Sequence, residues 1–128
     1  MQIHQSAEDY LETILMLNQR MGRVRSIDVV NELGYTKASV SIAMKKLREN
    51  GYIAVDGEGN LTLLEPGREI AERIYSRHRL LTHFFVQLGV DEEVAAEDAC
   101  KAEHILSEQT LEKIREYTLL HDAQDSVK

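Results

Sequence analysis

One short stretch of the chain, Cys100–His104, carries residue types that bind metal ions. If the stretch is helical, Cys100, Glu103 and His104 share one face, because positions three and four apart are neighbours on an α-helix. Thiolate, carboxylate and imidazole are the groups that hold divalent transition metals. A buried cysteine beside a surface Glu–His pair would give the same pattern for structural reasons. The stretch alone leaves both readings open, so other segments must supply further ligands if an ion binds.

Length and composition place the chain among globular proteins. It has 128 residues, of which 43% are hydrophobic and 29% charged, enough for one compact core or two small ones. Its apolar runs are too short to cross a bilayer, and the first residues lack the plan of a signal peptide. The single cysteine excludes an internal disulfide. We therefore expect a cytoplasmic protein.

Charge is unevenly distributed along the chain. The formal net charge is −7, yet residues 20–50 hold seven basic and three acidic side chains, while residues 89–128 hold four basic and eleven acidic ones. This asymmetry predicts a nucleic-acid-binding surface in the first half and a different role for the second half.

The first half has the pattern of a winged helix-turn-helix. Apolar periodicity predicts a helix from Ser6 to about Gly22, a second that begins at Ser26 and stops before Gly34, and a third from Thr36 to Asn50. Two β-prone runs, 52–55 and 61–64, flank a Gly-rich turn and predict a hairpin. A hairpin that directly follows the recognition helix is the wing of this motif.

The second half reads as helical. We expect a long helix from Pro66 to Leu88, a helix capped by Asp91 that ends near Leu106, and a last helix from Ser107 with a frayed tail after His121. The fold class is thus mainly α with a small β-hairpin. We expect residues 1–65 to form the DNA-binding domain and residues 66–128 a long linker helix with a helical metal-binding and dimerisation domain. The second half has few residues with which to build its own core, so it would complete one more readily against a second copy of the chain. A two-fold homodimer would also match a palindromic operator.

Four segments, in this order, resemble a known family. They are Glu8–Ile14, Thr36–Tyr52, Tyr75–Leu81 and Glu97–His104. The resemblance is to the metal-dependent transcriptional repressors related to the diphtheria toxin repressor and the manganese transport regulator. Longer members add a C-terminal SH3-like domain, for which this chain is too short, so it resembles the short, manganese-regulator branch.

The resemblance implies a set of metal ligands drawn from three helices. At the position of Cys100 the manganese branch usually has Glu and the iron-type branch has Cys. The ancillary site of the iron-type branch uses a carboxylate and a His where this chain has Thr82 and Ala96, so we do not expect that site. The implied cofactor is Mn²⁺ or Fe²⁺, with Co²⁺, Ni²⁺ and Zn²⁺ plausible in vitro. The implied ligands are Asp9, Glu12, His78, Cys100, Glu103 and His104.

The third helix supplies candidate DNA contacts, because the N-terminal part of a recognition helix reaches base edges. Solvated surface charges are the alternative for each position. The expected groove-facing residues are Lys37, Ser39, Ser41 and Lys45, and the expected phosphate contacts are Arg25, Thr36 and Arg48.

These observations predict a metal-responsive repressor of metal-ion homeostasis genes, in which the bound ion locks the dimer in a DNA-binding geometry. One alternative is a winged-helix regulator that senses no metal. A second is a helical dimetal enzyme, but the chain shows no paired Glu-x-x-His motifs, no nucleophile–base pair and no phosphate loop. We therefore expect no enzymatic activity, no small-molecule substrate and no membrane partner.

Overall fold

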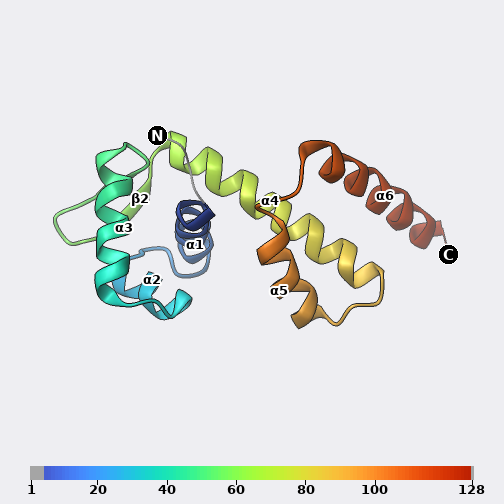
Figure 1. The fold of residues 1–128 in the computed structure, drawn as a ribbon, viewed down its shortest axis with the longest axis horizontal. Helices are drawn as coiled ribbons and strands as arrows, with labels where there is room; N and C mark the ends of the chain where they lie inside the picture. The colour runs from blue at the N-terminus through green and yellow to red at the C-terminus, as the bar shows by residue number, and fades with distance from the viewer. Residues whose placement is uncertain (1–4, 128) are drawn as a thin grey trace. The chain divides into compact units, whose positions relative to one another are not determined.

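The computed structural model describes residues 5–127, which form six helices and one two-stranded sheet (Figure 1). The chain divides into two compact units, Met1–Arg73 and Ile74–Lys128, and the division falls within the long helix α4. The predicted fold class is confirmed. The elements are α1 Gln5–Met21, α2 Ser26–Leu33, α3 Lys37–Glu49, β1 Ile53–Val55, β2 Leu61–Leu63, α4 Glu65–Gln87, α5 Glu92–Ala102 and α6 Glu108–Val127.

The helix-turn-helix forms where the sequence predicts it. Gly34 ends α2 in the left-handed region, with φ of 72°, and its N–H donates to the Val30 carbonyl at 2.8 Å. A side chain with a Cβ rarely adopts this conformation, so the glycine sets the turn. Thr36 then caps α3, since its Oγ1 accepts from the Ser39 N–H at 3.1 Å. α1 packs against α2, α3 and β2 to close the core of the first unit.

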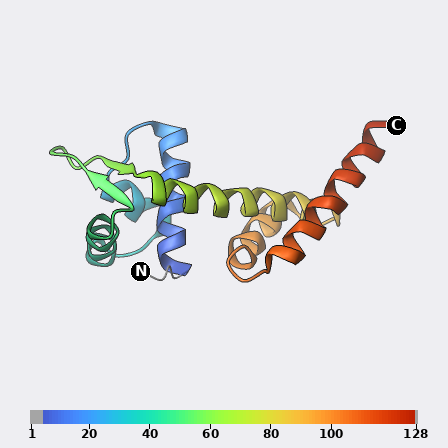
Figure 2. The same ribbon diagram turned by 90° about the horizontal axis from the view of Figure 1, so that it is seen from above.

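The wing is an antiparallel hairpin with Ile53 paired to Leu63. Its inward residues are buried, and the Leu61 N–H donates to the Val24 carbonyl at 2.7 Å. This bond ties the hairpin to the segment before α2. Figure 2 shows the wing extending outward from the three helices of the first unit.

The start of α4 packs tightly on the end of the wing. A Cβ added at Gly67 would lie 2.2 Å from the carbonyl oxygen of Tyr52, and that same oxygen accepts the Leu64 N–H at 3.0 Å. No side chain fits between the two backbones. The close approach explains why a glycine occupies the first turn of this helix.

The second unit has a small core in which α4, α5 and α6 meet. Two details differ from the sequence-based expectation. α5 ends at Ala102, because Glu103 and His104 form a turn rather than a further helical turn. α6 continues to Val127 because the polar residues after His121 include no glycine or proline to stop it. The core residues are Leu81, Ala99 and Leu111, with Leu80, Phe85, Ala102, Leu106 and Ile114 packed against them.

Across residues 5–127, no helix has the length and apolar character needed to cross a membrane. Several large apolar side chains of the second unit are nevertheless exposed to solvent. The most exposed are Ile105 (76%), Leu120 (66%), Leu119 (63%) and Leu88 (59%).

Candidate metal centre and DNA-binding surface

A buried carboxylate lies at the end of α5 in the second unit. Glu103, the residue that caps α5, has 0% of its surface exposed. Nδ1 of His78, on α4, lies 2.9 Å from its Oε2, and Nε2 of His104 lies 3.4 Å from its Oε1. Arg77 donates to the Glu103 backbone carbonyl at 3.1 Å and so holds the turn in place. Two imidazoles therefore converge on one carboxylate.

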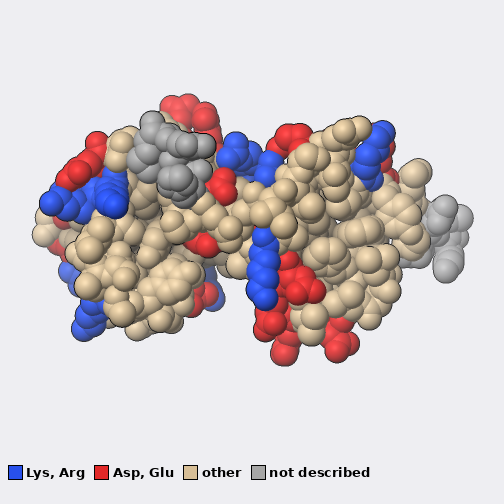
Figure 3. Space-filling model, in the orientation of Figure 1, with Lys and Arg blue, Asp and Glu red and all other residues tan. Residues whose placement is uncertain are grey.

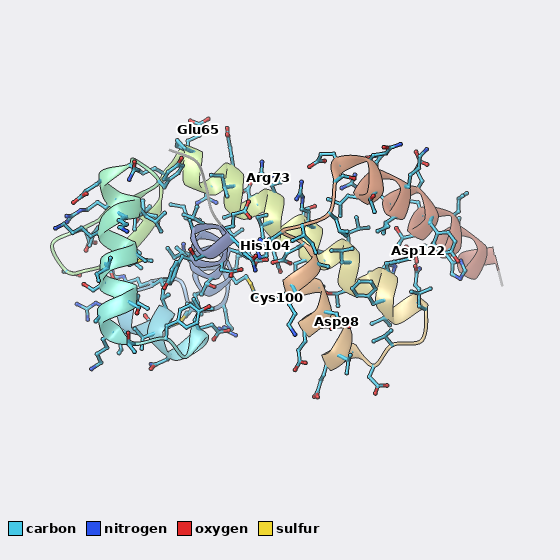
Figure 4. The ribbon with its side chains drawn as sticks, in the orientation of Figure 1. Glu65, Arg73, Asp98, Cys100, His104 and Asp122 are labelled. Carbon is cyan, nitrogen blue, oxygen red and sulfur yellow. The ribbon has the colours of Figure 1, made fainter. Side chains whose placement is uncertain are left out.

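The arrangement fits a divalent cation. Oε1 of Glu103 is buried and makes no hydrogen bond among residues 5–127. A buried acceptor without a donor costs free energy, and a positive ion would satisfy it. The sulfur of Cys100 also lies within 4.8 Å of a Glu103 carboxylate oxygen, although Cys100 itself is exposed (Figure 4). The donor set of this unit is thus one carboxylate, two imidazoles and one thiol.

The other two candidate ligands belong to α1 of the first unit. Asp9 is half-buried and Glu12 is 6% exposed. Their spacing of three puts both on one side of the helix. Glu8, next to Asp9, instead pairs with Arg73 at 3.3 Å and supports the packing of α4 on α1.

The outer side of α3 forms the candidate DNA-binding surface. Lys37, Ser41, Lys45 and Arg48 are all exposed there. Figure 3 shows lysine and arginine side chains over the part of the first unit that contains α3. Acidic side chains gather over α5 of the second unit. An open hollow beside the helix is lined by Ser26, Ser41, Met44, Lys45, Arg48 and Val55.

Three of the candidate DNA contacts already hold other groups in place. The hydroxyl of Thr36 donates to Ser39 Oγ at 2.8 Å while it accepts the Ser39 N–H, so both side chains take part in the cap of α3. Arg25 donates through Nε, at 3.0 Å, and through Nη2 to the carbonyl oxygen of Glu58 in the wing. The pattern of charges predicted an arginine facing DNA, but it could not reveal that the guanidinium contacts the hairpin.

One exposed residue of α3 was not among the sequence-based candidates. Ile42 is 58% exposed although the helix buries Val40, Met44 and Leu47. At about 100° per residue, Ile42 lies on the side opposite Val40. A helical-wheel projection of α3 would have found it.

Two family models together match nearly the whole chain. The model of the iron dependent repressor N-terminal DNA binding domain matches residues 2–61, and that of the iron dependent repressor metal binding and dimerisation domain matches residues 64–120. The chain belongs to the iron-dependent repressor family. The repressor is therefore a metal-responsive, DNA-binding transcriptional regulator that dimerises, and it is not an enzyme. These matches give no support to a metal-independent regulator or a dimetal enzyme.

Individual proteins agree with the family match. A helix-turn-helix transcriptional regulator of Methanocaldococcus jannaschii is 36% identical over 113 residues, which cover 87% of this chain and 90% of that protein. The helix-turn-helix transcriptional regulator MntR of Bacillus subtilis is 32% identical over 123 residues, covering 96% and 87%. A solved manganese-dependent transcriptional repressor in complex with manganese aligns with a TM-score of 0.80 at 28% identity. The alignment covers 88% of the repressor but only 52% of that solved chain.

Proposed function

We propose that the protein is a Mn²⁺- or Fe²⁺-activated repressor of metal-ion homeostasis genes. The observation that carries the proposal is the buried Glu103 carboxylate, which the imidazoles of His78 and His104 approach and whose Oε1 lacks a hydrogen bond within the described part of the chain. Similarity to regulators named for manganese supports the choice of metals. The proposed ligands are Asp9, Glu12, His78, Cys100, Glu103 and His104.

The donor types indicate which ions the site would accept. Carboxylate oxygens with imidazole nitrogens suit Mn²⁺ and Fe²⁺, and a thiolate shifts the preference towards softer ions. The order of affinities for divalent ions means that Co²⁺, Ni²⁺ and Zn²⁺ would also bind in vitro.

The ligands would couple metal binding to DNA binding. Asp9 and Glu12 belong to the helix that packs on the helix-turn-helix, while the other four belong to the dimerisation domain. A bound ion would supply positive charge, which favours the ionised form of each carboxylate that it contacts. Coupling free energies of about 1–3 kcal/mol are typical of such effectors and would change DNA affinity roughly 5- to 150-fold.

The proposed target is a palindromic operator bound by a homodimer. Residues 1–65 would read the DNA through Lys37, Ser39, Ser41 and Lys45, with Thr36 and Arg48 beside the phosphates and Arg25 acting through its contact with the wing. Residues 66–128 would bind the metal and the second copy, and the exposed apolar side chains of α4 and α6 supply surface for that contact. Since the repressor acts on operator DNA, we place it in the cytoplasm.

A DNA-binding titration tests the proposal. Operator affinity is measured with Mn²⁺, with anaerobic Fe²⁺, with Zn²⁺ and with a chelator, and metal stoichiometry is determined on the same samples. We expect Mn²⁺ or Fe²⁺ to raise the affinity at least several-fold over chelator. Equal affinity under all four conditions would reject the metal switch.

A further inference from the structure

Ile42 is an apolar side chain on the most polar face of the recognition helix. It is 58% exposed, whereas the inner residues Val40, Met44 and Leu47 are at most 4% exposed. Its neighbours one turn away are Ala38 and Lys45, and both are exposed as well. Keeping a branched apolar side chain in water is unfavourable, so a partner that covers Ile42 would gain its burial free energy.

The surroundings of Ile42 indicate what covers it. Lysines at positions 37, 45 and 46 flank it, and the family match assigns this domain to DNA binding. Positive charge favours the phosphate backbone over a basic or apolar protein surface. In the major groove, the apolar group that distinguishes one base from the others is the C5-methyl of thymine.

We infer that Ile42 determines specificity by packing against the C5-methyl group of a thymine in each operator half-site. The inference rests on the proposed DNA-binding function and deepens it, because it names the base that α3 reads by an apolar contact. Ala38 adds a small methyl one turn earlier on the same side, where a larger side chain would hold the helix farther from the bases. The lysines would then position the helix on the phosphates while Ile42 selects the base.

Removing one methyl group at a time from the DNA tests this assignment. Duplexes that bind the full-length protein in saturating Mn²⁺ are selected from a random library, and each thymine of a half-site is then replaced by deoxyuridine, which lacks only the methyl group. We expect one thymine position at which the replacement weakens binding by about four-fold, the factor that corresponds to one buried methyl group. In the Ile42→Ala protein the same replacement should have almost no effect, because the methyl group has lost its partner.

Two controls keep the assignment falsifiable. Ile27→Ala removes an isoleucine on α2 that is 43% exposed, and it should leave the thymine-to-deoxyuridine ratio unchanged. If Ile42→Ala lowers the affinity too far to measure, the wild-type deoxyuridine scan and the milder Ile42→Val still give the answer. If a selected duplex tolerates deoxyuridine at every thymine position, the proposed role of Ile42 is wrong, but the DNA-binding proposal still stands. Failure to select any duplex, with or without metal, would overturn the DNA-binding proposal as well.

Discussion

Nδ1 of His78 lies 2.9 Å from Oε2 of Glu103, and this contact joins the middle of α4 to the end of α5. The carboxylate is fully buried, and its Oε1 accepts no hydrogen bond from the rest of the described chain. A fully buried acid retained at this point is costly for folding alone. Its cost is explained if the acid serves to bind an ion.

Replacing Glu103 by glutamine should separate metal binding from folding. Gln has nearly the same size but no charge, so the Glu103→Gln protein should stay dimeric and keep the thermal stability of the metal-free wild type. Its metal-stimulated DNA binding should fall to the level seen with chelator. The added stability that Mn²⁺ gives the wild type, about 2.7 kcal/mol at a hundred-fold excess over the dissociation constant, should also disappear.

The matched control for this variant is Glu97→Gln, which changes an exposed acid on α5, the helix that Glu103 caps. It should keep the full metal response. An undiminished response in Glu103→Gln, measured by the same DNA titration, would contradict the proposed site.

Cys100 should govern which metal activates the repressor. Its sulfur lies within 4.8 Å of a Glu103 carboxylate oxygen, and the residue as a whole is exposed. Cys100→Glu replaces a soft donor by a hard one, so activation by Mn²⁺ should improve relative to Zn²⁺ and Co²⁺. The measurement is the metal concentration that gives half-maximal DNA binding for each ion. Identical ratios in Cys100→Glu, Cys100→Ser and wild type would show that the thiol takes no part.

The sequence predicted the elements better than their contacts. Gly34, Thr36 and Pro66 lie at the ends of helices and act through local backbone chemistry. Periodicity and capping residues were therefore enough to locate those helices. The contact of Arg25 with the wing depends on where the hairpin folds back, which no local pattern encodes. The end of α5 at Ala102 was missed because residues 103–106 contain no helix-breaking residue, and the turn there is fixed instead by the tertiary contacts of Glu103.

In the candidate site, too, the grouping of residues was predictable from the sequence, whereas their surroundings were not. Spacing alone grouped Cys100, Glu103 and His104, and the structure does bring these side chains together with His78. The spacing could not distinguish the environments of these residues: Glu103 is fully buried, whereas Cys100 is exposed. Such a difference arises from the packing of three helices and so has no signature within a five-residue stretch.

Arg25 should influence DNA binding by holding the wing in position. Because both its Nε and Nη2 donate to the Glu58 carbonyl, Arg25→Ala should weaken operator binding without changing its salt dependence. Loss of a phosphate contact from both subunits of the homodimer would instead reduce the slope of log affinity against log salt by about 1.8, or about 0.9 per contact. Arg48→Ala, which removes a proposed phosphate contact, provides that reference slope. Arg25→Lys should not restore affinity, since lysine lacks the planar fork that spans one carbonyl with two donors. A reduced slope for Arg25→Ala would show that it contacts phosphate.

Gly67→Ala should destabilise the first unit. The new Cβ would meet the backbone oxygen of Tyr52 at 2.2 Å, and a backbone atom cannot move aside as the end of a side chain can. Overpacking of this kind costs about 1–3 kcal/mol. Thermal unfolding should report the loss as a fall of several degrees, at about 4–8 °C per kcal/mol for a domain of this size. Gly57→Ala is the control, because a Cβ there meets nothing within 4 Å and φ is not positive. Equal melting temperatures for the two variants would refute the tight-packing account.

Asp56 should make the wing sensitive to acid. Its carboxylate accepts the Asn60 backbone N–H at 2.9 Å, the Asn60 side chain at 3.0 Å and the Glu58 N–H at 2.9 Å, and these bonds hold its pKa below the ordinary value of 3.8. A lowered folded-state pKa means that the stabilisation is complete above 3.8 and is lost as the pH falls through the folded-state value. An NMR titration of the full-length protein should therefore place the Asp56 midpoint below 3.8. Asp56→Ala should loosen the hairpin amides at neutral pH, and the difference from wild type should shrink as the pH is lowered. A midpoint at or above 3.8 would show that the turn does not favour the charged form.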